Sequence, residues 1–204
     1  NNRDKWNTEV PLYQAGKIVG IDRRGIDHIS RFARKRLYFF VLISMNTLLR
    51  PTRELTSCRW RDLKLTPSGK VKGAMIPSLT THQAKRSNPR MKSDRIRTAI
   101  GTYGSTKFFL RWRRICRDFG YGQEEDYIFP NWQSDRSIKV QSKAAEMGRT
   151  FTLLLEKAGL RKDPDGANIT LYSSRAQAIT NRIQKPDWDI AKVAQAAHTS
   201  ILTI

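Results

Sequence analysis

The sequence has 204 residues, which is enough for one domain with a proper hydrophobic core. Lysine and arginine outnumber aspartate and glutamate by 38 to 18, so the formal net charge is +20. This charge is larger than solubility requires and predicts a polyanionic partner. No apolar run approaches the ~20 residues of a membrane-spanning helix, and no signal peptide is recognisable. We therefore expect nucleic acid, and not a membrane, as that partner.

The cysteines and histidines indicate neither a disulfide nor a metal site. Cys58 and Cys116 both stand in apolar helical stretches, which is typical of reduced core residues in a cytosolic protein. The three histidines show no spacing typical of metal ligands. The chain begins at Asn1 without a methionine, so we expect a fragment of a longer protein.

The first helix is expected after a polar lead-in of residues 1–24. Residues 25–37 have apolar residues at helical spacing, which predicts an amphipathic basic helix. Such a helix either lies on a phosphate backbone or presents an ordinary solvated face. Its basic residues are Arg31, Arg34, Lys35 and Arg36.

A mostly buried helix and a helix break follow. Residues 37–49, LYFFVLISMNTLL, are apolar at nearly every position. Arg50 ends this run, because Pro51 disfavours the α conformation in the residue before it. Glu54 then falls in the first turn of the next helix, where a carboxylate suits the positive end of the dipole. A guanidinium between two packed helices needs a partner, and both a salt bridge to Glu54 and a bound anion are open.

Short strands are expected after Asp62. The stretches LKL, KVKGAMIP (with a turn at Gly69), SLTTHQAK and DRIRTAIG predict a small antiparallel sheet of about three strands. Between the last two lies a polar loop, residues 85–94, KRSNPRMKSD. This loop is either a solvated turn or a mobile source of cations above a phosphate.

Four further helices complete the prediction. Residues 105–121 predict a helix capped by Ser105, with aromatic side chains in the core, and residues 139–159 a helix that stops at Gly159. The next helix starts near Thr170, and a short amphipathic helix ends the chain. The expected buried positions of these last two helices are Ala176, Ile179 and Ile183, and then Ile190, Val193, Ala194 and Ala197.

The stretch 47–63, TLLRPTRELTSCRWRDL, resembles the first arginine motif of the tyrosine recombinases, or phage integrases. That motif has a helix-ending arginine, a short spacer, a glutamate and a leucine-arginine-tryptophan-x-aspartate run. The spacer from Arg50 to Glu54 is one residue longer than the commonest form, and Arg53 is a rival for the arginine role. The segment PRMKSDRIRTAI resembles the arginine-methionine-lysine hairpin of the family, which makes Lys92 the expected catalytic lysine and Lys85 the alternative.

Later segments resemble the family in the same order. YIFP resembles a short apolar segment before the later helices, and Tyr172 to Arg175 matches the histidine-x-x-arginine motif. Tyr172 departs from the usual histidine; a phenol with a pKa near ~10 is no general base at neutral pH, but its hydroxyl can hydrogen-bond a phosphate. AHTSILTI resembles glycine-histidine-serine-serine, which points to His198, or to Thr199 if the alignment shifts by one. The nucleophilic tyrosine of the family would follow Ile204, so we expect it to be absent here.

The resemblance spans residues 25–204 and implies one catalytic domain: an α+β, mainly α-helical fold with a small three-stranded antiparallel sheet. It implies site-specific recombination of double-stranded DNA through a 3′-phosphotyrosyl intermediate, without metal or nucleotide cofactor. The implied roles are the following: Arg50 and Arg175 hold the phosphate, Lys92 protonates the leaving oxygen, and His198 and Tyr172 donate to the phosphate or orient the nucleophile.

The resemblance further implies a cytoplasmic protein encoded by a bacterium or phage, of a kind that mobile elements carry. We expect a monomer in solution, and a tetramer on DNA for the full-length protein. Two other functions stay open. One is a non-catalytic nucleic-acid-binding module derived from the same fold, of which Tyr172 is a sign. The other is a type IB topoisomerase, which shares these residues but relaxes supercoils.

Overall fold

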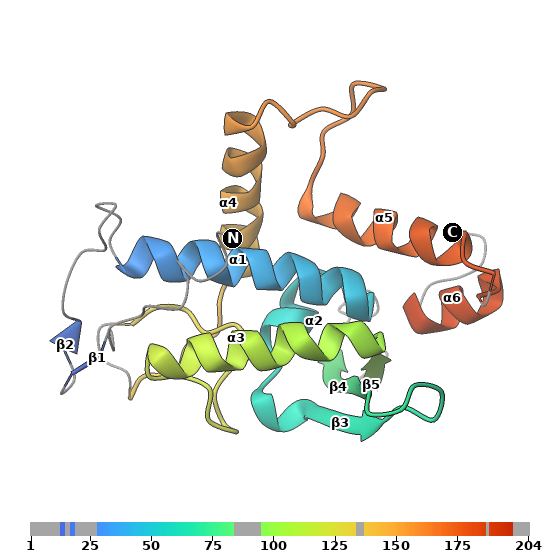
Figure 1. Cartoon of the computed structure of the whole chain (residues 1–204). Coiled ribbons are helices and arrows are strands. Elements are labelled where there is room, and N and C mark those ends of the chain that lie inside the picture. Colours follow the sequence, from blue (N-terminus) through green and yellow to red (C-terminus); the bar gives the residue numbers. More distant parts are fainter. Residues whose placement is uncertain are drawn as a thin grey trace, which may run out of the picture.

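The computed structural model describes the backbone of residues 13–14 and 17–18, and residues 28–83, 95–133, 137–186 and 188–197. The described part is mainly helical, with one three-stranded sheet and a short two-stranded pairing near the amino terminus (Figure 1). The helices are α1 (His28–Thr47), α2 (Arg53–Thr56), α3 (Thr106–Asp118), α4 (Ala144–Lys157), α5 (Leu171–Ile183) and α6 (Ile190–Ala197), with 3-10 turns η2 (Trp60–Asp62) and η3 (Tyr103–Ser105). The strands are β1 (Tyr13–Gln14), β2 (Lys17–Ile18), β3 (Leu63–Pro67), β4 (Met75–Gln83) and β5 (Arg95–Ile100).

Helix α1 joins the basic and the apolar segments of the sequence into one helix of 20 residues. It runs beside α3, and its carboxy-terminal end points toward α5 and α6 (Figure 1). Phe32, Phe39, Phe40 and Ile43 are buried along its length. The helix is therefore the central element against which the other helices pack.

Arg36 does not belong to a solvated basic face, contrary to the sequence expectation. Its side chain is buried and donates to Glu146 on α4 at 2.8 Å and to the Pro130 carbonyl at 3.1 Å. A further bond reaches the Asn131 side chain at 3.0 Å. Burial lowers the pKa of the Arg36 guanidinium, which the Glu146 carboxylate opposes. Arg36 thus ties α1 to α4 and to the loop before it.

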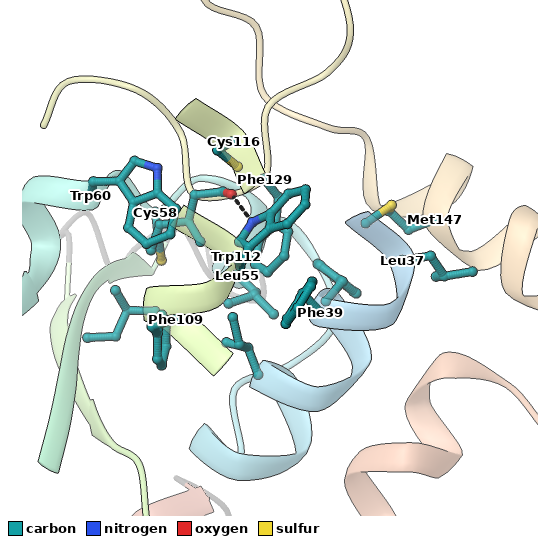
Figure 2. Close-up of a cluster of buried hydrophobic side chains, with 14 of the residues drawn as sticks. Leu37, Phe39, Leu55, Cys58, Trp60, Phe109, Trp112, Cys116, Phe129 and Met147 are labelled. Atoms are coloured by element: carbon teal, nitrogen blue, oxygen red, sulfur yellow. Dashed lines mark hydrogen bonds between the residues drawn. The ribbon is translucent and has the colours of Figure 1, made fainter. Parts of the chain in front are cut away.

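The main core lies between α1, α3 and the loop that follows α3. Figure 2 shows Trp112 of α3 in this cluster, with Phe39, Leu55 and Phe129 nearby. The indole Nε1–H of Trp112 donates to the Ile128 carbonyl at 2.6 Å, so this large ring is buried without an unpaired donor. Ser105 occupies the expected cap position of α3, but its hydroxyl donates to the Thr102 carbonyl instead of capping the helix.

Cys58 and Cys116 both lie in the main core as free thiols, as expected from their apolar surroundings. Burial raises the pKa of both thiols well above the ordinary value. Neither side chain is placed for thiolate chemistry.

The sheet has the order β3-β4-β5 with both pairings antiparallel, which confirms the expected three strands. The segment KVKGAMIP forms no strand of its own, because its last residues begin β4 at Met75. The turn before β4 has its positive φ at Gly73, not at the expected Gly69. On β5 the burial alternates, with Arg97 and Ala99 inward.

Helix α4 begins at Ala144, five residues after the expected start, and Gly159 follows its end with a φ of 69°. Gln141 instead forms a bridge with Pro130. Pairing of this stretch with the loop before it explains the later start of the helix.

Helix α5 begins after Thr170, whose hydroxyl accepts the Ser173 N–H at 3.4 Å as a helix cap. Its predicted buried positions were wrong in part. Ala176 is exposed, and Ile179 and Ile183 are only partly buried. The buried residues of α5 are Leu171, Arg175, Ala178 and Arg182.

Helix α6 buries Val193, Ala194 and Ala197 as predicted, whereas Ile190 is exposed. The helix packs against α5, with contacts also to β5 (Figure 1). This packing places the end of α6 beside the turn between α1 and α2.

Candidate active site

The turn between α1 and α2 presents Arg50. Leu48 is buried and has a φ of 55°, a left-handed conformation that reverses the chain after α1. Thr52 caps α2, because its hydroxyl accepts the Glu54 N–H at 3.4 Å. The Glu54 carboxylate in turn accepts the backbone N–H of Arg50 at 3.2 Å. The turn is therefore held by its own backbone and caps, which leaves the Arg50 side chain available.

Glu54 forms its ion pair with Arg97 of β5 and not with Arg50. The Arg97 Nη1 lies 2.5 Å from Glu54 Oε1, and both side chains are almost fully buried. Within the described residues, the guanidinium of the half-buried Arg50 has no hydrogen bond or ion pair. The sequence left two possible partners for Arg50, a salt bridge to Glu54 and a bound anion. The structure excludes the salt bridge to Glu54. The Arg50 guanidinium is therefore available to bind an anion.

Arg175 reaches three acceptors from the second turn of α5. Its Nε donates to the Leu48 carbonyl at 2.9 Å, and its Nη2 to the Ala197 carbonyl at 2.6 Å. Its Nη1 donates to the Tyr172 hydroxyl at 3.2 Å. The side chain is 4% exposed, so these bonds define its position. Arg175 thus connects the Arg50 turn with the end of α6.

Arg50, Arg97 and Arg175 share one electrostatic environment. Burial lowers the pKa of Arg175, the Tyr172 side chain opposes this, and the charge of Arg50 lowers it further. Burial lowers the pKa of Arg97 to about 10; Glu54 opposes the shift, and Arg50 and Arg175 add to it. The Glu54 carboxylate attracts both Arg97 and Arg175, and the charge of Arg50 repels both. A bound anion would relieve the repulsion among them.

Tyr172 stands in the first turn of α5 and is half exposed. Its hydroxyl oxygen accepts the bond from Arg175, and the Arg175 guanidinium carbon lies 5.6 Å from the ring centroid. Because the oxygen is the acceptor, the phenolic proton can be donated to an outside group. Tyr172 is therefore placed as a hydrogen-bond donor beside the arginines.

The structure brings together Arg50, Arg175 and Tyr172 of the residues expected from the sequence. Arg53, the rival of Arg50, is exposed on α2. The other candidates, namely Lys92 with its alternative Lys85 and His198 with its alternative Thr199, lie outside the described residues.

Sequence reasoning missed Arg97. Its segment, DRIRTAIG, is predicted as a strand, and an arginine on a strand is ordinarily expected on the solvent side. The signal that could have found it is Glu54, because a carboxylate in a buried first turn requires a cation from elsewhere in the chain.

The described residues contain neither a group of histidine, cysteine and carboxylate side chains suited to a metal ion nor a helix long and apolar enough to cross a membrane.

No family model matches the sequence, and no curated protein matches it. Among solved structures, the chain is similar to the crystal structure of XerA recombinase, with a TM-score of 0.57 and 19% identity. The match covers 86% of this chain and 55% of the XerA chain, so this chain spans about half the length of that protein. The helices and the three-stranded antiparallel sheet described above thus form the fold of a tyrosine recombinase catalytic domain.

Proposed function

We propose that this chain is the catalytic domain of a tyrosine-type site-specific recombinase that cleaves and rejoins double-stranded DNA. The observation that carries the proposal is the cluster of Arg50 and Arg175 beside the Tyr172 hydroxyl, in which the Arg50 guanidinium has no partner among the described residues. The recombinase fold and the net charge of +20 support it.

The proposed reaction transfers a phosphoryl group to the protein. The oxygen of a tyrosine carboxy-terminal to His198 attacks the phosphorus and loses its proton to a base. The bond from phosphorus to the 5′ oxygen breaks, and that oxygen takes up a proton. The products are a 3′-phosphotyrosyl link and a free 5′-hydroxyl. Attack by the 5′-hydroxyl of a partner strand reverses the steps, so no nucleotide supplies energy.

The residues of this chain have distinct tasks in that reaction. Arg50 and Arg175 stabilise the charge that builds up on the non-bridging oxygens, because a guanidinium presents a planar fork of donors. We assign the donation of the proton to the leaving oxygen to Lys92, and hydrogen bonds to the phosphate to Tyr172 and His198. The protein acts as a monomer in solution and a tetramer on DNA.

The experiment uses the protein as its gene encodes it and a nicked suicide substrate made from the DNA that flanks the gene. A covalent protein–DNA adduct is measured on a denaturing gel. Arg50→Ala should reduce the rate of adduct formation by about 100-fold to 1000-fold, as loss of one preorganised donor does. Arg53→Ala is the matched control, because it removes an exposed arginine from the same turn. Equal losses in both variants would contradict the assignment of Arg50.

A second candidate function is a nucleic-acid-binding module without catalysis. The observation in its favour is Tyr172, a phenol at the position where the family has histidine. Salt-sensitive DNA binding without any adduct would support it. In that case the Tyr172→His variant tests whether this single residue accounts for the missing cleavage.

A further inference from the structure

The register of β5 is the opposite of what hydrophobicity favours. Ile96 and Ile100 point outward and are 68% and 61% exposed, whereas Arg97 between them is 3% exposed. The pairing with β4 sets this register, with Thr81 opposite Arg97. A shift by one residue would bury both isoleucines and release the arginine to water. Hydrophobicity therefore does not explain the buried position of Arg97, and its contacts have to be considered.

Arg97 contacts two elements of the site at once. Its Nη1 binds the Glu54 carboxylate at 2.5 Å, and the other oxygen of that carboxylate holds the Arg50 N–H. Its Nη2 faces the Ala196 carbonyl on α6 at 3.5 Å, the outer limit of a hydrogen bond. The last carbonyls of a helix have no intrahelical partner and carry partial negative charge, so a cation is favoured there even at this distance.

We propose that Arg97 is a positioning residue that sets the distance between the Arg50 turn and the end of α6. This inference rests on the proposed function. Arg97 directs one terminal nitrogen at Glu54 and the other at the Ala196 carbonyl, and it acts through these two groups.

The first experiment measures hydrogen exchange in the protein as its gene encodes it, with Arg97→Met. The protection factors of the α6 amides should fall at least tenfold. The protection factors of the α3 amides should change only as much as the free energy of global unfolding does. Arg36→Met is the matched control. Like Arg97, Arg36 is a buried arginine that pairs with a glutamate, but it lies on α1 and pairs with Glu146 on α4, not with any residue of α6. Equal protection of α6 in the two variants would overturn the proposal.

The second experiment separates positioning from stability. The double variant Glu54→Gln with Arg97→Met removes both charges, so no unpaired charge stays buried. Most of the stability that each single variant loses should therefore return in the double variant. If Arg97 positions α6, the single-turnover cleavage rate at saturating DNA stays about 100-fold low in the double variant, as expected for a misplacement near 1 Å. The dissociation constant for DNA should stay within about threefold, because Arg50 and Arg175, the residues assigned to the phosphate, are unchanged in this variant.

The outcomes are distinguishable. If both the stability and the cleavage rate recover in the double variant, Arg97 only stabilises the fold as the partner of Glu54, and the positioning role is contradicted. Arg97→Lys gives a second test that keeps the charge; it should retain stability better than Arg97→Met and restore only part of the α6 protection. If the unsubstituted protein forms no adduct, the proposed function fails, while the exchange experiment still decides whether Arg97 holds α6.

Discussion

The Nη2 of Arg175 lies 2.6 Å from the carbonyl oxygen of Ala197, and this bond links α5 to the last residue of α6. The same guanidinium donates through Nε to the carbonyl of Leu48, just past the end of α1. Both acceptors belong to helix ends, where carbonyls lack intrahelical partners. The guanidinium has five N–H donors and uses three of them on protein atoms, so one remains on each Nη. Arg175 can hold the fold together and still present donors to a phosphate.

Arg175 and Arg182 provide a comparison between a site arginine and a structural one. Arg182 is also buried on α5, donates to the Asn46 carbonyl, and has its pKa lowered by burial to about 10. Replacing either residue by methionine should lower the free energy of unfolding by roughly 1.5–3 kcal/mol, the range for hydrogen bonds to charged groups. Only Arg175→Met should abolish the covalent adduct. Urea unfolding and the adduct gel measure the two effects, and loss of the adduct in both variants at equal stability would contradict the distinction.

Glu54→Gln should be strongly destabilising. The substitution leaves the Arg97 guanidinium inside the protein without its carboxylate, and breaking such a pair costs about 3–5 kcal/mol. Glu125→Gln is the control, because Glu125 pairs with Arg61 on the exposed surface. That loss should stay below about 1 kcal/mol. Chemical denaturation of both variants checks the difference, and similar midpoints would mean that the buried pair contributes no more than an exposed one.

The two thiols should be unreactive in the folded protein. Burial raises the pKa of Cys58 and Cys116, and neighbouring carboxylates add to the effect. In the native protein at pH 8, both thiols should therefore react with an aromatic disulfide reagent only as fast as the protein unfolds. In denaturant, both thiols should react at once. Rapid labelling of either cysteine under native conditions would contradict this placement. If one thiol does react rapidly, the Cys58→Ala variant shows which cysteine it is, because labelling that persists in this variant belongs to Cys116.

Helix α6 should loosen in acid through Asp189. The Asp189 carboxylate accepts the Lys192 N–H at 2.7 Å at the start of α6, and this bond lowers the carboxyl pKa. A carboxyl group whose pKa is lower in the folded state stabilises that state above its unfolded pKa of about 4 and loses this contribution as the pH falls further. Exchange protection in α6 should therefore decrease below about pH 4.

The control for this prediction is Asp189→Asn, whose side-chain oxygen can accept the same bond at every pH. The acid-dependent part of the α6 protection should disappear in this variant. An unchanged pH profile would assign the acid sensitivity to another carboxylate.

Much of the fold follows from apolar periodicity. The central helix from Phe32 to Ile43, the aromatic side of α3 around Trp112, and the buried face of α6 all lie where the sequence places them, because large apolar side chains dominate the burial. The three strands likewise follow from short apolar runs between turns.

The errors that matter most for the site concern buried arginines. Arg36 is expected on a basic helix face, and Arg97 and Arg182 are given no role, yet all three are buried. An arginine is buried only when carboxylates or carbonyls from distant parts of the chain satisfy it, and sequence periodicity does not contain that information. The order of the recombinase-like motifs identified Arg50, Tyr172 and Arg175 as site candidates. Arg97 stands in no such motif and became visible only through its contact with Glu54.

Helix α6 has eight residues, and the side chains that it buries are one valine and two alanines. Burying so little apolar surface contributes only about a few kcal/mol to the packing of α6 on the domain. Hydrogen bonds from Arg175 and Arg97 to the last carbonyls of α6 add to this stabilisation. We therefore expect α6 to open at a lower free energy than α1 and α3, which the large aromatic side chains of the main core hold together.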